Sequence, residues 1–175
     1  MGRKVYYFEA YRAEEKIKLS GIKGKKVVVL IARVHPSEAC SSYMIKGFLE
    51  AFLDMQDKDA AEFLRNHFYF LVIPMVNPDG VSVGNSRCSF SGNDLNQVWS
   101  NPDRFVHPEI FYIKRLMIKL KKENDLIFFT DFHGDFHNKG ALIKGCHLQS
   151  NPKATREFPF LLENLMPMFS YFDSR

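Results

Sequence analysis

Apolar residues in the chain fall into runs whose lengths and spacings predict alternating strands and helices. Nearly continuous β-branched and aliphatic runs predict buried strands at residues 26–34, 68–76 and 126–131, the first of them buried on both faces. Apolar positions that recur with helical spacing predict helices at residues 37–53, 57–66, 108–122 and 155–165. Residues 81–103 are rich in Ser, Asn, Gly and Asp and have no periodicity, so we expect a long surface loop there. This order predicts an α/β fold with a largely parallel central sheet flanked by helices.

Polar side chains follow each of the predicted strands. His35 and Glu38 come after the first, the sequence NPDG (77–80) after the second, and DFHGDFH (131–137) after the third. A His and a Glu three residues apart can bind one metal ion, although a glutamate near a helix start is also commonplace. His133 is the candidate third ligand because ligands collect at the carboxyl ends of strands in this architecture. Two histidines and a glutamate leave one coordination position for water, which is typical of hydrolytic zinc sites.

Composition and charge narrow the classes of function. With 46% hydrophobic and 14% aromatic residues, the 175-residue chain can bury the core of one domain. Its net charge of +4 is spread over short clusters, which does not indicate nucleic-acid binding. Its 3 widely spaced cysteines favour a reducing compartment, and the amino-terminal region has no apolar stretch long enough for a signal peptide or a membrane span. We therefore expect a cytoplasmic protein with no nucleic-acid or membrane partner.

The long loop contains the sequence NSRCSFSGNDLNQVW, which carries a resemblance to a known family. Together with ARVHPSE, IPMVNPDGVSVG, HPEI, TDFHG, KGCH and FPFLLENLMPMFS, it resembles the zinc metallocarboxypeptidases, specifically their cytosolic carboxypeptidase branch. The resemblance implies a zinc carboxypeptidase-like fold with a mixed, largely parallel sheet. It also implies that residues 1–25 are an N-terminal lead-in and that residues 26–175 form a partial catalytic domain.

The resemblance also implies roles for individual residues. The zinc ligands are His35, Glu38 and His133, which bind one ion per chain. Arg87 polarises the scissile carbonyl and stabilises the oxyanion, as a fixed cation beside developing negative charge does. Asp94 accepts a hydrogen bond from the non-ligating nitrogen of His35 and so sets its tautomer.

Residues 96 and 97 match the positions that hold the terminal carboxylate of a substrate. Asn96 matches the family residue, whereas Gln97 stands where the family has an arginine. Glutamine has no positive charge and lacks the planar fork with which arginine grips a carboxylate. The resemblance further implies that the general-base glutamate, a substrate-capping tyrosine and later strands of the sheet follow position 175, so that the fold is incomplete at its C-terminal side.

These observations support different readings of the function. The first is a metallocarboxypeptidase that uses zinc-activated water to remove residues from a peptide or protein C-terminus or a glutamylated side chain, with tubulin as the implied target. The second is a catalytically degenerate family member or fragment that binds zinc and has a binding or regulatory role. The third is a zinc amidohydrolase for small N-acyl amino acids, against which the long match through NPDGVSVGNSRCS argues.

Overall fold

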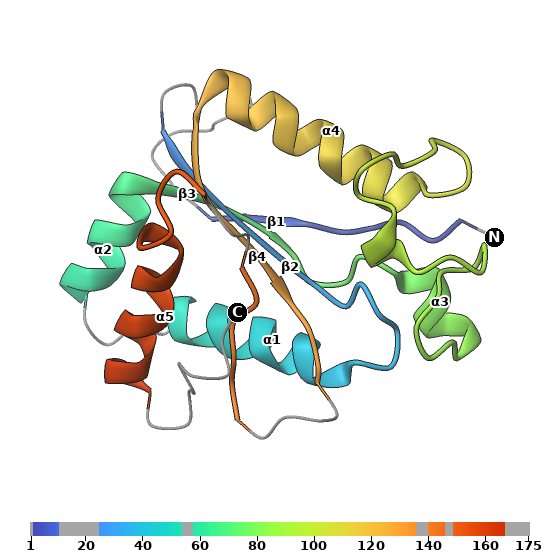
Figure 1. Ribbon diagram of the computed structural model, residues 1–175, viewed down its shortest axis with the longest axis horizontal. Coiled ribbons are helices and arrows are strands. Elements are labelled where there is room, and N and C mark those ends of the chain that lie inside the picture. The colour runs from blue at the N-terminus through green and yellow to red at the C-terminus, as the bar shows by residue number, and fades with distance from the viewer. Residues whose placement is uncertain (1, 11–24, 54–57, 136–139, 146–148, 167–175) are drawn as a thin grey trace. The chain divides into compact units, whose positions relative to one another are not determined.

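The computed structural model describes residues 2–10, 25–53, 58–135, 140–145 and 149–166 (Figure 1). The chain divides into two compact units, Met1–Gly134 and Asp135–Arg175. The first unit holds the sheet and every residue predicted to act at the site, and the second contains helix α5 (Ala154–Leu165). No helix in the described part of the chain is long and apolar enough to cross a membrane.

The first unit is built from short strands that alternate with helices. Its strands are β1 (Phe8–Ala10), β2 (Lys26–Ala32), β3 (Phe68–Ile73) and β4 (Asp125–Phe132). Its helices are α1 (Ala39–Leu53), α2 (Lys58–His67), α3 (Pro78–Val83), the 3-10 turn η2 (Leu95–Gln97) and α4 (Pro108–Glu123).

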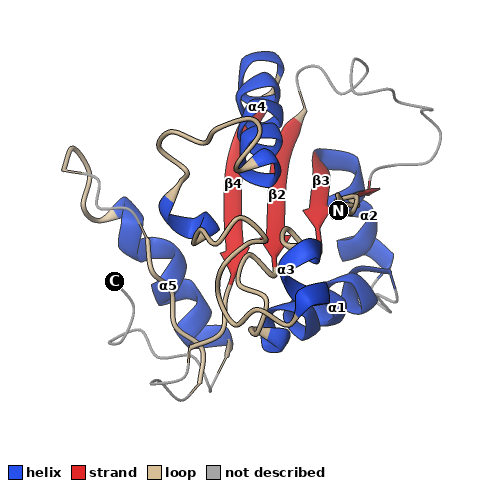
Figure 2. Ribbon diagram, turned by 90° about the vertical axis from the view of Figure 1, so that its right-hand side faces the viewer, coloured by secondary structure: helices blue, strands red, loops and turns tan. Residues whose placement is uncertain are grey.

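The strands form one mixed sheet in the order β1-β3-β2-β4, of which Figure 2 shows β3, β2 and β4 side by side. Strand β2 runs parallel to both β3 and β4, whereas β1 pairs antiparallel with β3. The predicted α/β fold with a mixed, largely parallel sheet is therefore confirmed. Strand β1 was not predicted, because a strand of 3 residues carries no recognisable apolar run.

Helices cover both faces of the sheet, with α4 on one side and α1 on the other (Figure 1). Successive residues of a strand point to opposite faces, so the continuous apolar run of β2 supplies both sides. The buried cluster on the α4 side includes Val27, Val29, Ile31, Leu71, Ile110, Ile113 and Leu120. The cluster on the α1 side includes Val28, Leu30, Ala32, Ile45, Phe52, Phe70 and Val72. Strands β2 and β3 are thus fixed between two apolar layers.

Strand β4 is less buried than its apolar sequence predicted. Ile127 is 45% exposed and Phe129 is 40% exposed. The reason is its place at the end of the strand order, where β2 is its only strand neighbour among the described residues. The prediction of a third buried strand was wrong in this respect.

Strands β2 and β3 end earlier than the apolar runs suggested, and the chain turns there toward the site. Strand β2 stops at Ala32 because Arg33 adopts a left-handed backbone with a φ of 57°. Strand β3 stops at Ile73, next to Pro74, which has no backbone N–H to donate to a sheet. The two exits stay connected, since Val76 N–H donates to the Ala32 carbonyl at 3.0 Å.

The sequence NPDG begins a short helix, α3. Asn77 caps α3 by accepting a hydrogen bond from Gly80 N–H at 2.9 Å, and Pro78 occupies the first helical position, which suits proline. The Asn77 side chain is buried and its Nδ2 donates to the Val34 carbonyl at 3.2 Å. The cap of α3 therefore also holds the chain segment that leads into His35.

Gly80 lies where a side chain has no room. A Cβ added there would lie 2.6 Å from Asn77 Oδ1 and 2.6 Å from Pro36 Cγ. We expect Gly80→Ala to lower the free energy of unfolding by about 1–3 kcal/mol, because the cap and the neighbouring loop must move apart. Urea unfolding of the purified chain measures this change.

Gly47→Ala is the matched control. Gly47 is an exposed residue of α1, and an added Cβ there would have nothing within 4 Å. The substitution should raise the free energy of unfolding by about 0.5–1 kcal/mol, because alanine favours the helix. Equal stability of Gly80→Ala and the wild type would show that the packing around Asn77 and Pro36 is not restrictive.

Candidate metal centre

His35 and Glu38 lie on the loop between β2 and α1. Both side chains are buried, with 3% exposure at His35 and 6% at Glu38. The loop turns tightly, since Glu38 N–H donates to the His35 carbonyl at 3.3 Å and Ser41 N–H donates to the Glu38 carbonyl at 3.0 Å. These bonds lead directly into the first turn of α1, which begins at Ala39.

His133 reaches the same place from the end of β4. The parallel pairing of β2 and β4 runs up to the pair Ala32 and Phe132. The residues that follow each strand therefore leave the sheet at the same edge, as expected for parallel strands. This register brings together residues that lie far apart in the sequence.

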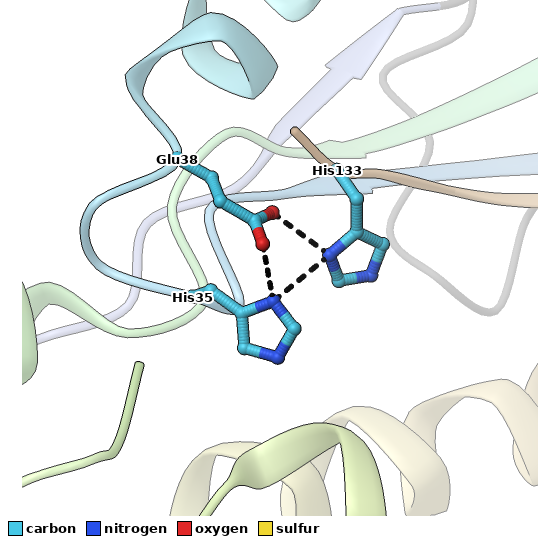
Figure 3. A group of neighbouring side chains, drawn as sticks. All are labelled: His35, Glu38 and His133. Atoms are coloured by element: carbon cyan, nitrogen blue, oxygen red, sulfur yellow. Dashed lines mark hydrogen bonds and ion pairs between the residues drawn. The ribbon is translucent and has the colours of Figure 1, made fainter. Parts of the chain in front are cut away.

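The side chains of His35, Glu38 and His133 point toward one another (Figure 3). His35 Nδ1 lies 2.7 Å from Glu38 Oε1, and His133 Nδ1 lies 3.0 Å from Glu38 Oε2. The two Nδ1 atoms are 3.2 Å apart. All three predicted ligands thus present one donor atom each to a common point.

The donor set and its spacing fit a zinc ion. Tetrahedral zinc with bonds of about 2.0–2.2 Å sets its ligand atoms about 3.3 Å apart, close to the separations found among these atoms. Each histidine also has its other nitrogen directed at a carboxylate: His35 Nε2 lies 3.0 Å from Asp94 Oδ1, and His133 Nε2 lies 2.8 Å from Asp131 Oδ2. When each Nε2 carries the proton of that bond, both Nδ1 lone pairs face the Glu38 carboxylate. A cation at this point satisfies all three.

Asp131 is the site residue that the sequence analysis missed. The sequence places Asp131 at the end of the third predicted strand. Residues two apart in a strand point to the same face, so the spacing of Asp131 and His133 was the only signal of a contact between them. Burial raises the pKa of Asp131 above its ordinary value. Burial opposes the charging of His133, but the bonds to Asp131 and Glu38 outweigh it and raise the pKa of the imidazole.

Gly134 completes the surroundings of Glu38. Its N–H donates to Glu38 Oε2 at 2.8 Å, and a Cβ added to it would lie 2.6 Å from Cys40 Sγ. A side chain at this position would force Cys40 Sγ to move. Burial raises the pKa of Glu38, but the bonds from Gly134, His35 and His133 outweigh burial and hold the pKa below its ordinary value. The carboxylate is therefore ionised and oriented.

Asp94 connects the metal ligands to Arg87. Its Oδ1 accepts from His35 and from Asn96 N–H at 2.9 Å, and its Oδ2 accepts from Arg87 Nε at 2.7 Å. Burial opposes ionisation, but these bonds together lower the pKa of Asp94. The Arg87 side chain is 54% exposed, so its guanidinium is held at one edge and open to solvent at the other.

Asn96 and Gln97 lie in η2, directly after Asp94. Both residues are exposed. The Asp94 side chain caps η2, and Leu95 anchors it by packing, fully buried, in the core cluster on the α4 side. The side chains at 96 and 97 are therefore presented from a fixed turn.

Comparison with known proteins identifies the family. The family model described as zinc carboxypeptidase matches residues 1–134. The chain belongs to the zinc carboxypeptidase family. Among its relatives, cytosolic carboxypeptidase 2 of Mus musculus is 41% identical over 152 residues, covering 86% of this chain and 17% of the relative. Cytosolic carboxypeptidase 3 of Mus musculus is 38% identical over 154 residues, covering 84% of this chain and 15% of the relative.

Solved structures share the fold. A metallo-carboxypeptidase from Burkholderia cenocepacia superimposes with a TM-score of 0.82 at 24% identity and covers 99% of this chain and 45% of that chain. An aspartoacylase family protein from Mesorhizobium loti has a TM-score of 0.63 at 13% identity, covering 94% of this chain and 45% of that chain. The family match favours the carboxypeptidases over the amidohydrolase reading. The chain spans 15% to 17% of the length of the curated relatives named above.

The two aspartates that hold the histidines should control zinc affinity. Asp94→Asn and Asp131→Asn keep a side chain of similar size but remove the negative charge that orients each imidazole. We expect each substitution to weaken zinc binding about 10- to 100-fold. Competition with a chromophoric chelator measures the affinity.

Asp125→Asn is the control for these variants. Asp125 is exposed at the start of β4, the strand that ends beside His133. Its substitution should leave zinc affinity unchanged. If Asp94→Asn and Asp131→Asn behave like this control, the aspartates do not orient the ligands.

Proposed function

We propose that the protein is a zinc-dependent metallocarboxypeptidase that hydrolyses C-terminal residues from peptides or proteins. The observation that carries this proposal is the convergence of His35 Nδ1, Glu38 and His133 Nδ1, with a carboxylate behind each histidine. Family membership makes zinc the metal of this group. A set of two histidines and one carboxylate leaves a coordination position for water, as in hydrolytic zinc sites.

Bound zinc would lower the pKa of a water molecule to about 7 and polarise the carbonyl under attack. We assign to His35, Glu38 and His133 the task of holding the ion, and to Asp94 and Asp131 the task of orienting the imidazoles. Arg87 then stabilises the negative charge that develops on the carbonyl oxygen. Its support by Asp94 fixes the guanidinium in advance, so it need not reorganise during the reaction.

We further propose acidic protein tails, with glutamylated tubulin as the candidate, as the substrate class. The support is the similarity to cytosolic carboxypeptidases. Asn96 and Gln97, side by side on η2, are the proposed contacts of the terminal carboxylate. We place the protein in the cytoplasm, in keeping with the names of these relatives.

Zinc content and peptide hydrolysis, measured on the same preparations, test this function. We expect about one zinc per chain by elemental analysis, lost in both His35→Ala and His133→Ala, because removal of a ligand leaves too few donors for a zinc site. Hydrolysis of a peptide with a polyglutamate tail is followed in parallel by mass spectrometry. His67→Ala is the control, since His67 ends α2 and bonds to the Phe63 carbonyl.

The outcomes separate the proposed enzyme from its alternative. Zinc binding with release of terminal glutamate, absent in the ligand variants, supports the carboxypeptidase. Zinc binding without hydrolysis supports the catalytically degenerate reading, in which the chain retains a binding or regulatory role. A folded wild type that binds no zinc would contradict both.

Gln97 should limit the affinity for a terminal carboxylate. A charge-assisted hydrogen bond contributes about 1.5–3 kcal/mol, so Gln97→Arg should tighten binding of a peptide with a free C-terminus roughly 10- to 100-fold. The same variant should bind the C-terminally amidated peptide as weakly as the wild type does. Isothermal titration with the two peptides measures the difference, and equal gains for both would show that residue 97 does not contact the carboxylate.

A further inference from the structure

Arg33, the residue directly after β2, has an unusual backbone conformation. It begins the loop that carries His35 and Glu38, here called the metal loop. Its φ is 57°, and it is the only residue other than glycine with a positive φ in the described ranges. This left-handed region is unfavourable for residues with a Cβ, and Gly, Asn and Asp are the residues that usually occupy it. The backbone conformation alone therefore does not explain why residue 33 is an arginine.

The side chain of Arg33 folds back over the metal loop. Its Nε donates to the Pro36 carbonyl at 2.8 Å, and its NH1 donates to Ser42 Oγ at 2.9 Å. The backbone N–H of Arg33 donates to Ser41 Oγ at 3.1 Å, and that hydroxyl donates to the Glu38 carbonyl at 2.7 Å. One residue thus bonds to the loop on both sides of Glu38.

One of these contacts, at Pro36, lies between the two ligands, and the others lie in α1 just after Glu38. Pro36 separates His35 from Ser37 and Glu38, and the Arg33 guanidinium is the only hydrogen-bond partner of the Pro36 carbonyl among the described residues. Ser42 lies in the first turns of α1. The guanidinium therefore ties the ligand-bearing loop to the helix that follows it, using the two separate donors that an arginine fork provides.

The rest of the loop is held from other directions. The Asn77 side chain donates to the Val34 carbonyl at 3.2 Å, and Ser37 N–H donates to the Ser86 carbonyl at 3.0 Å. The Ser37 bond also holds the segment between the two ligands, from the side of Ser86. The Arg33 side chain adds the bonds to the Pro36 carbonyl and the Ser42 hydroxyl, which tie this segment to the start of α1.

We propose that Arg33 is a positioning residue that fixes the separation of His35 and Glu38 before the metal binds. This inference rests on the proposed zinc site. The left-handed backbone directs the guanidinium onto the loop, and the hydrogen bonds to Pro36 and Ser42 offset its conformational cost. Arg33 contacts neither ligand side chain, so it acts through the backbone that carries them.

Arg33→Gly separates the two features of the residue. Glycine accepts a φ of 57° without strain but has no guanidinium. We expect zinc affinity to fall about 10- to 100-fold, as for other residues that orient ligands, and the visible absorption of the cobalt-substituted protein to shift. The melting temperature of the zinc-stripped protein should stay near that of the wild type.

Two further variants test the role of the fork. Arg33→Lys keeps the charge with a single donor group, so it should recover only part of the affinity lost in Arg33→Gly. Ser42→Ala removes one acceptor and leaves the bond to Pro36, so it should have a smaller effect than Arg33→Gly.

Leu120→Ala controls for a general loss of stability. Leu120 is buried in α4, in the core cluster on the opposite side of the sheet from α1, and its truncation should lower the melting temperature without changing zinc affinity. The proposal is overturned if Arg33→Gly binds zinc within about twofold of the wild type with an unchanged cobalt spectrum, or loses no more affinity than Leu120→Ala. Absence of zinc from the wild type would instead contradict the metal site itself.

Discussion

The structure depends on holding two imidazole nitrogens and a carboxylate close together. The Nδ1 atoms of His35 and His133 lie 3.2 Å apart, and each is within 3.0 Å of a Glu38 oxygen. Such atoms repel one another unless a cation or a proton lies between them, so the surrounding fold must hold the three side chains in place. It does so through the parallel pairing of β2 with β4, which ends beside the site, and through the apolar layers on both faces of β2.

Asp94 makes the metal ligands and the proposed oxyanion cation interdependent. One oxygen of Asp94 accepts a hydrogen bond from His35, and the other accepts one from Arg87. The backbone N–H of Asn96 also donates to this carboxylate. Any change that rotates this carboxylate alters the imidazole and the guanidinium together. The energetic effects of substitutions at His35, Asp94 and Arg87 are therefore not expected to add, because the residues share one hydrogen-bond network.

The sequence predicts the strands and helices better than it predicts the side-chain contacts between them. Apolar periodicity locates the longer elements because burial on one or both faces leaves a clear pattern, and the polar residues after β2 and β4 indicate the ligands. The contact of Asp131 with His133 depends on side-chain direction at the end of β4, and the bonds of Arg33 depend on a backbone angle that no pattern of residue types encodes. The exposure of β4 depends on its place in the sheet, which local sequence does not determine.

The charges around the centre explain why a single neutral residue at position 97 matters. With each carboxylate ionised, Glu38, Asp94 and Asp131 together balance a divalent zinc ion and the guanidinium of Arg87. The centre then exerts little net attraction on a distant carboxylate, and binding of a substrate's terminal group depends on short, directed contacts. Arginine would add both a charge and a bidentate contact at this point, whereas Gln97 offers only neutral hydrogen bonds from the exposed turn η2. Under the proposed function, selection of a terminal carboxylate would come from geometry more than from the electrostatic field of the site.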